Sequence, residues 1–148
     1  MGKKTNGGFL ISQIKQIQGR VFERLLNEAN VDEFNGAQGR ILYILWQADS
    51  IPIISLSKQT GLAKTTLTSM LDRMEQAGLI VRIFDKTDRR QVKISLTDKA
   101  RSLKPEYDDL ANKMVGIFYK GFSDMEIDAF ESNLVKIVNN LMEAESEK

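Results

Sequence analysis

The residues in this sequence that can do chemistry are cations and hydroxyls, gathered in two neighbouring segments. In residues 64–73 a lysine is followed by four threonines or serines within five positions, and residues 85–91 read Asp-Lys-Thr-Asp-Arg-Arg-Gln. Short hydroxyls donate to and accept from base edges, while Lys and Arg neutralise backbone phosphates. This combination of side chains is typical of a surface that binds double-stranded DNA.

The charged segment lies between two apolar, alternating runs, 80–84 and 92–97. This pattern predicts a β-hairpin with the charges at its tip. Asp88 and Arg90 stand two residues apart, so they point the same way on an extended chain. An Asp in a turn accepts backbone N–H groups, and here it can orient Arg90 toward a minor groove. The other two cations of the tip then face phosphates or solvent. The alternative is a tip that is charged only for solubility.

A helix is predicted over residues 64–78, because apolar residues recur at helical spacing from Leu67 to Met74 and Gly78 is a natural stop. Its other face carries the hydroxyls. Thr and Ser are mediocre helix formers, so their concentration there favours binding over helix stability as their role. The alternative is an ordinary solvated helix face. The candidate DNA-binding residues of helix and hairpin are Lys64, Thr65, Thr66, Thr68, Ser69, Arg73, Lys86, Asp88, Arg89 and Arg90.

A second, shorter helix is predicted just upstream, over residues 56–60, with Ser55 as its cap and Gly61 as its stop. Two short helices separated by a glycine-containing turn are the outline of a helix-turn-helix. Residues 51–54, which precede this pair, are expected to be extended because the residue before a proline avoids the helical region.

Two capping boxes mark the starts of two other helices. Asn35 with Gln38 predicts a helix that ends near residue 48, and Ser123 with Glu126 predicts a helix that runs to about residue 143. In each box the first side chain accepts from the third helical N–H, and the later side chain accepts from the capping residue.

The terminal segments are also predicted to be helical. Residues 9–30 are amphipathic, and Thr97 caps a helix that runs toward residue 119, with a kink at Pro105 or a true start nearer Leu103. The apolar faces of the terminal helices can pack on one another within one chain. They can equally form a two-fold dimer interface, in which a patch meets its own copy.

Composition sets the class of protein. A chain of 148 residues, 42% hydrophobic and 28% charged, is expected to be one globular domain. No apolar run approaches the ~20 residues of a membrane span, and no signal peptide is evident, so we expect a cytoplasmic protein with no membrane partner. Cys and His are absent. Without these residues no disulfide, thiol switch, metal site, cofactor or catalytic constellation is expected, and an enzyme is the least favoured class.

The nearly neutral total charge conceals an uneven distribution. Residues 55–101 hold ten Lys or Arg against five Asp or Glu, whereas the rest of the chain holds 11 against 15. A local surplus of positive charge matters for phosphate binding more than the total does. A fluctuation of this size also arises by chance, so the charge supports the DNA-binding interpretation only together with the hairpin.

The order of these motifs resembles the MarR family of bacterial transcription regulators. The resemblance rests on Asn35-x-x-Gln38, on Leu-Ala-Lys-Thr-Thr-Leu-Thr at 62–68, on Gly-Leu-Ile-x-Arg at 78–82, and on a wing that reads Asp-x-Arg from Asp88 and ends in Leu-Thr. It covers nearly the whole chain. It implies a mainly α fold with a small β-hairpin wing, in which a winged helix-turn-helix is flanked by N- and C-terminal dimerisation helices.

In that fold, residues 1–148 form a single domain. Dimerisation helices at 9–30 and 98–143 flank a DNA-binding region at 35–97. The resemblance implies a homodimer on a palindromic operator, with the hydroxyl helix in the major groove and Arg90 in the minor groove. It also implies a repressor that is released by a small effector, often aromatic or phenolic.

Two positions depart from the family pattern. Ala63 stands where a capping Ser or Asp is frequent, and Ala100 stands where Gly is frequent. The absence of Cys excludes the peroxide-sensing branch of the family, and the absence of His argues against the zinc-sensing branch. The five apolar residues nearest the expected ligand site are expected to be core rather than ligand contacts; they are Ile14, Ile17, Val21, Trp46 and Phe118. The competing function is a winged-helix module that binds protein and no DNA.

Overall fold

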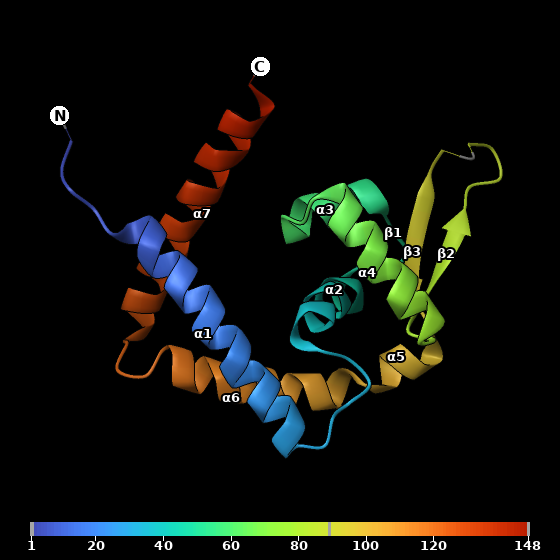
Figure 1. Cartoon of the computed structure of the whole chain (residues 1–148), viewed down its shortest axis with the longest axis horizontal. Helices are drawn as coiled ribbons and strands as arrows, with labels where there is room; N and C mark the ends of the chain where they lie inside the picture. Colours follow the sequence, from blue (N-terminus) through green and yellow to red (C-terminus); the bar gives the residue numbers. More distant parts are fainter. Residues whose placement is uncertain (1, 89, 148) are drawn as a thin grey trace. The chain divides into compact units, whose positions relative to one another are not determined.

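The computed structural model describes residues 2–88 and 90–147, and Figure 1 shows the arrangement of their elements. The described residues form seven helices and one small sheet. The helices are α1 (Gly7–Glu28), α2 (Gly36–Gln47), α3 (Ile53–Thr60), α4 (Lys64–Gln76), α5 (Asp98–Ser102), α6 (Lys104–Phe118) and α7 (Asp124–Ser146). The strands are β1 (Ile51–Pro52), β2 (Ile80–Phe84) and β3 (Val92–Leu96). The predicted fold class, mainly α with a β-hairpin wing, is confirmed.

The chain divides into two compact units, Met1–Ala111 and Asn112–Lys148, with the division inside α6. The first unit contains the helix-turn-helix and the sheet. The sheet is antiparallel in the order β1-β3-β2, and β2 pairs with β3 from Ile80 opposite Leu96 to Phe84 opposite Val92. The hairpin predicted from alternation is therefore confirmed.

The prediction for residues 51–54 is only half right. Ile51 and Pro52 form β1 opposite Ile94 and Lys93, but α3 already begins at Ile53. Pro52, extended at ψ 149°, is the N-cap, and no side chain caps the helix. Ser55 is therefore inside α3 and is not its cap. Proline fixes its own φ near the value a helix start accepts, so the turn into α3 needs no capping hydroxyl.

The core of the first unit lies beneath α4. Leu67, Leu71 and Met74 of α4 are fully buried, together with residues of α2, α3 and the sheet. This is the apolar stripe predicted from the sequence. Burying a side chain of this size stabilises the fold by about 1.5–3 kcal/mol. The stripe therefore fixes which face of α4 turns outward.

Backbone features confirm most of the predicted helix ends. Asn35 and Gln38 form the reciprocal capping box of α2, with bonds of 2.8 Å and 3.1 Å. Gly61 and Gly78 end α3 and α4 with φ of 74° and 76°, in the left-handed region that favours glycine. Ala63 provides α4 with no side-chain cap, as its residue type predicts.

The helix predicted from residue 98 toward 119 is two helices. Thr97 caps α5 as expected, accepting from the Ala100 N–H, but α5 ends at Ser102 and α6 begins at Lys104. Pro105 lies in the first turn of α6, where its missing N–H costs nothing. Of the two outcomes expected here, the start near Leu103 is the correct one.

The second unit contains the end of α6 and α7, joined by a turn in which Gly121 has φ 90°. Ser123 and Glu126 form the predicted capping box of α7. Phe118, Tyr119 and Phe130 pack ring against ring around this turn, and the hydroxyl of Tyr119 donates to Glu131. Desolvation, the larger effect, and this bond to a carboxylate together raise the pKa of Tyr119 to about 12.

Large apolar side chains are exposed on the terminal helices of the single chain. On α1, Ile14 and Ile17 are 39% and 45% exposed, so the expectation that they are core is wrong for this chain alone. Val21, Trp46 and Phe118 are half-buried, each within its own unit. In the second unit the exposed apolar residues are Val115, Ile117, Phe122, Met125, Val135, Ile137, Val138, Leu141 and Met142. Among the described residues, no helix combines the length and the apolar character that a membrane crossing requires.

Candidate nucleic-acid interface

The outward face of α4 collects the predicted helix contacts on one surface. Burial of Leu67 and Leu71 forces the intervening polar residues outward, and all six predicted α4 residues are exposed: Lys64, Thr65, Thr66, Thr68, Ser69 and Arg73. The hydroxyls of residues 65, 66, 68 and 69 make no hydrogen bond to other described residues. Their donors and acceptors are therefore available to a ligand.

The start of α4 adds a second kind of donor. Ala63 offers no capping side chain, so the first backbone N–H groups of α4 point away from the helix without a partner side chain among the described residues. Lys64 stands at the same end. Free N–H groups, the positive end of the helix dipole and a lysine together favour a phosphate.

The tip of the wing is organised by two aspartates. Asp85 Oδ1 accepts from the N–H and the hydroxyl of Thr87, at 2.8 Å and 2.7 Å. These two bonds, the hydroxyl bond first, lower the pKa of Asp85 and keep it ionised. Asp88 Oδ1 accepts from the N–H and the Nε of Arg90, at 3.0 Å and 3.2 Å. The predicted pairing of Asp88 with Arg90 is therefore present in the structure.

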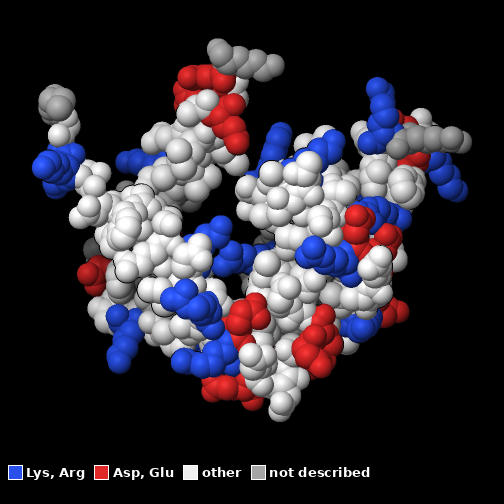
Figure 2. Space-filling view, viewed as in Figure 1, with Lys and Arg blue, Asp and Glu red and all other residues white. Residues whose placement is uncertain are grey.

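Arg90 is held by Asp88 at its backbone N–H and at the Nε of its guanidinium. Its side chain is 92% exposed, so the guanidinium extends from the tip into solvent while Asp88 directs it. Lys86 is exposed beside it. Arg89, the third predicted cation of the tip, lies outside the described residues. Figure 2 shows Lys and Arg side chains around the tip of the wing and more of them over the α3–α4 region of the viewed face.

A residue that sequence reasoning missed joins the wing to α4. Arg82 of β2 donates to Asp72 and to Glu75 of α4, both at 2.7 Å, and its side chain is only 15% exposed. This contact holds the helix and the strand together and neutralises two acids on α4. The sequence signal for this contact was an arginine on the buried side of a predicted strand, between apolar residues.

A second unpredicted contact lies at the root of the wing. Asp49 accepts from the Leu96 N–H at 2.9 Å, from Ser95 Oγ at 3.1 Å and from Arg101 at 2.6 Å. Burial acts to raise the pKa of Asp49, but these bonds, led by that from Leu96, outweigh it and lower the pKa. The contact ties the loop after α2 to β3 and α5. Its partners lie 46 to 52 residues away in sequence, which no local pattern reveals.

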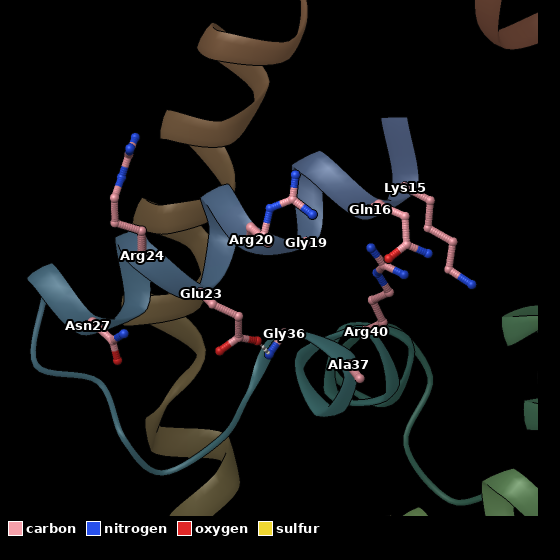
Figure 3. A pocket seen from close by; sticks show the side chains of 10 residues that line it. All are labelled: Lys15, Gln16, Gly19, Arg20, Glu23, Arg24, Asn27, Gly36, Ala37 and Arg40. Carbon is pink, nitrogen blue, oxygen red and sulfur yellow. Dashed lines mark hydrogen bonds between the residues drawn. The ribbon is translucent and has the colours of Figure 1, made fainter. Parts of the chain in front are cut away.

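A groove of about 580 Å³ opens between α1 and α2 of the same unit (Figure 3). Its walls carry four cations and one acid, and that acid, Glu23, already accepts from the Gly36 N–H at 2.5 Å. The cations are Lys15, Arg20, Arg24 and Arg40. None of the five apolar residues considered for a ligand site lines this groove. Arg24 is paired with Glu28 at 3.4 Å, which leaves three cations beside a carboxylate that is already occupied. This lining is suited to a small organic anion.

In the described part of the chain, no group of three or more acidic, His or Cys side chains lies close enough together to hold a metal ion.

Comparison with known sequences identifies the family. The sequence profile of the MarR family matches residues 34–92, which span α2 to the start of β3. The HTH-type transcriptional regulator TtmR of Methylorubrum extorquens is 34% identical over 99 residues, which are 67% of this chain and 49% of that protein. The chain thus matches only about half the length of that relative.

A second relative matches over more of its length. The organic hydroperoxide resistance transcriptional regulator of Bacillus subtilis is 30% identical over 118 residues, 80% of this chain and 78% of that protein.

Solved structures share the fold. A mutant MarR from E. coli complexed with operator DNA superposes with a TM-score of 0.76 at 23% identity, covering 92% of this chain and 99% of that one. BpsR of Bordetella bronchiseptica, described with regulation of its DNA binding by 6-hydroxynicotinic acid, gives 0.78 at 22% identity and covers 90% and 98%.

Proposed function

Because the chain belongs to the MarR family, we propose that it is a homodimeric, sequence-specific DNA-binding transcription regulator that acts as a repressor. The observation that carries the proposal is the face of α4. It exposes four unpaired hydroxyls between Lys64 and Arg73, while the apolar residues behind them are buried. A solvated face has no need of this choice of residues, since Thr and Ser weaken a helix.

In this proposal α4 lies in the major groove. Thr66 and Thr68 contact base edges, with hydroxyls as donors or acceptors and methyl groups against thymine methyls. Lys64 and the uncapped start of α4 hold a phosphate, which completes the cap that Ala63 lacks. Arg73 reaches a phosphate or a guanine edge near the other end of the helix.

The wing provides a second contact. Asp88 directs the guanidinium of Arg90 into an adjacent minor groove, while Lys86 and Arg89 bind phosphates. Support comes from the geometry of the tip, where Asp88 engages both the backbone and the side chain of Arg90 and leaves the rest of that side chain free.

The functional particle in this proposal is a dimer, in which residues 1–148 act as one domain. The dimerisation helices are 9–30 and 98–143, and the DNA-binding region is 35–97. The exposed apolar residues of α1 and of the second unit support an interface that is absent from the single chain. Two copies of α4 related by a two-fold axis would read a palindrome with half-sites about 34 Å apart.

The effector in this proposal is a small aromatic anion that binds in the groove between α1 and α2. Four cations surround this groove, and the related BpsR is described as regulated by 6-hydroxynicotinic acid. The similarity to a hydroperoxide regulator brings no thiol switch with it, because none of the 148 residues is Cys. The regulator works in the cytoplasm, catalyses no reaction and needs no cofactor.

A winged-helix module that binds only protein is the competing function. The positive surplus of residues 55–101 and the free hydroxyls of α4 favour DNA over a protein partner. The two functions differ in their response to competitor DNA. Competitor DNA would displace a regulator from its bound duplex, but it would leave the complex of a protein-binding module with its partner unaffected.

The test is selection of bound fragments from a random double-stranded pool at about 0.15 M salt, with the mass of the purified particle measured alongside. A palindrome with half-sites about one helical turn apart, bound by a particle of twice the chain mass, is the expected result. Binding without enrichment of any sequence, or binding by a monomer, would contradict the proposal.

A further inference from the structure

Phe84, the last residue of β2, is a large aromatic side chain in the wing that is 61% exposed. It is followed in sequence by the charged tip, which begins at Asp85, and its partner across the hairpin is Val92. An exposed phenylalanine beside a candidate DNA surface raises the question of what covers it.

The register of the sheet shows which way the ring points. Side chains alternate along a strand, so Phe84 shares a face with Arg82 and Ile80. Ile80 is buried in the core, and Arg82 reaches the acids of α4. Phe84 therefore projects on the side of the sheet that carries α4. Val81 and Ile83 project on the opposite side.

Phe84 lies further along that face than Arg82, the residue that is ion-paired with α4. Two residues of strand, about 6.6 Å, separate it from Arg82 toward the tip. The tip that carries Arg90 follows it in sequence, and its face of the strand is the one from which Arg82 reaches α4. In Figure 1 the hairpin of β2 and β3 stands beside α4. As the last residue of β2, Phe84 lies at the tip end of this hairpin, on the face that Arg82 shares.

We propose that Phe84 is a further DNA-contact residue, which packs against an apolar group of the duplex between the groove bound by α4 and the groove bound by Arg90. The apolar groups a duplex offers there are the thymine methyl and the deoxyribose ring. This inference rests on the proposed DNA-binding function. A residue of this kind adds affinity without adding charge, so its contribution does not vary with salt.

The strand provides a matched control. Ile83 is also a large apolar residue of β2 and is 45% exposed, but it lies on the opposite face. Removing either side chain deletes exposed apolar surface from the same strand. Only removal of Phe84 should alter DNA binding.

The experiment compares Phe84→Ala and Ile83→Ala in the full-length chain, on the operator recovered by selection, using fluorescence anisotropy at two salt concentrations. Phe84→Ala should bind about tenfold more weakly at both concentrations, since one buried apolar side chain accounts for that factor. Ile83→Ala should bind within about twofold of the parent. Phe84→Leu, which keeps apolar bulk, should fall between and guards against a folding defect in the alanine variant.

Replacing each operator thymine with deoxyuridine, which removes only the methyl group, separates the two apolar partners. Loss of affinity at one thymine in the parent but not in Phe84→Ala identifies the methyl. No effect of deoxyuridine, with Phe84→Ala still weakened, identifies the sugar. Equal binding by the parent and Phe84→Ala overturns this inference alone. Failure of the parent to bind any sequence specifically overturns the proposed function, and this inference with it.

Discussion

At the scale of single residues, the strongest candidate for a specific role is Arg90. Its guanidinium is exposed and directed by Asp88, an arrangement that presents a cation with little loss of conformational freedom on binding. Arg90→Ala should weaken operator binding by about 1–3 kcal/mol and leave the thermal unfolding midpoint unchanged. Measurement of operator affinity beside a melting curve tests this. Parent-like affinity would remove the wing tip from the interface.

The α4 threonines should affect which base is preferred. Thr66→Ala and Thr68→Ala each remove a hydroxyl and a methyl while leaving the cations in place, so sequence preference should change more than total affinity. Repeating the selection with each variant measures this as a shift in the recovered operator. An equal loss on every sequence, specific and non-specific, would instead assign the residue to a phosphate.

Asp49 offers a prediction about stability. Folding lowers its pKa, so the folded protein binds its proton less tightly than the unfolded chain does. The contribution of Asp49 to the free energy of unfolding is therefore complete above its unfolded pKa near 3.8. It is lost as the pH falls through the lower pKa of the folded state.

Asp49→Asn should accordingly destabilise the protein at pH 7, by about 1–2 kcal/mol for lost charge-assisted hydrogen bonds at a partly exposed site. Urea unfolding of parent and variant at pH 7 and at pH 3 measures the difference, which should shrink at the lower pH. A difference that is the same at both pH values would show that the charge of Asp49 is not the cause.

At the scale of elements, the contact between α4 and β2 governs how the interface is presented. Arg82→Ala leaves Asp72 and Glu75 unneutralised on α4 and frees β2 from the helix. Operator affinity should fall by about tenfold, although Arg82 itself is paired with these acids and not with the proposed duplex. Arg82→Lys keeps the charge but loses the planar fork that binds two carboxylates, so it should rescue only part of the loss.

The matched control for Arg82 is the variant Asp72→Asn with Glu75→Gln. It removes the contact without leaving free negative charge on α4. If repulsion of phosphate causes the loss, this double variant should bind DNA nearly as well as the parent at low salt. If the position of the wing causes it, the double variant should be as weak as Arg82→Ala. Parent-like affinity of Arg82→Ala would show that the contact serves neither purpose.

The sequence predicted those elements whose cause is local. The capping box at Asn35, the stop at Gly78 and the alternation of β2 are decided by residues within a few positions of one another, and all three are present. Asp88 and Arg90 were predicted for the same reason.

The features that sequence reasoning missed depend on distant partners. The partners of Asp49, the two-residue strand β1 and the acids bound by Arg82 become neighbours only after the chain folds. The early start of α3 was missed because Ser55 looked like a better cap than an extended Pro52. The groove between α1 and α2 was not predicted because its lining is charged, whereas the candidate ligand-site residues were apolar.

At the scale of the whole molecule, the question is how an effector would alter DNA binding. The groove between α1 and α2 joins the helix whose exposed apolar residues are proposed for dimerisation to the first helix of the DNA-binding region. An anion held by Arg20 and Arg40 would link these two elements, and so bias the separation of the two copies of α4. Thermodynamic linkage requires the effect to be mutual: the factor by which the anion weakens DNA binding equals the factor by which DNA weakens anion binding.

Arg20→Ala and Arg40→Ala should therefore each weaken binding of 6-hydroxynicotinate by about 10- to 100-fold, as expected for a lost charge-assisted bond, and leave effector-free operator affinity unchanged. Calorimetry with and without operator measures both the effector affinity and the operator affinity. The matched control is Lys136→Ala, which removes a cation from α7, outside the groove. The uncharged amide analogue should bind poorly to the parent, because the groove selects for negative charge. Equal binding of acid and amide, or a response to the acid that survives both arginine substitutions, would place the effector elsewhere and leave the groove as a solvated gap between two helices.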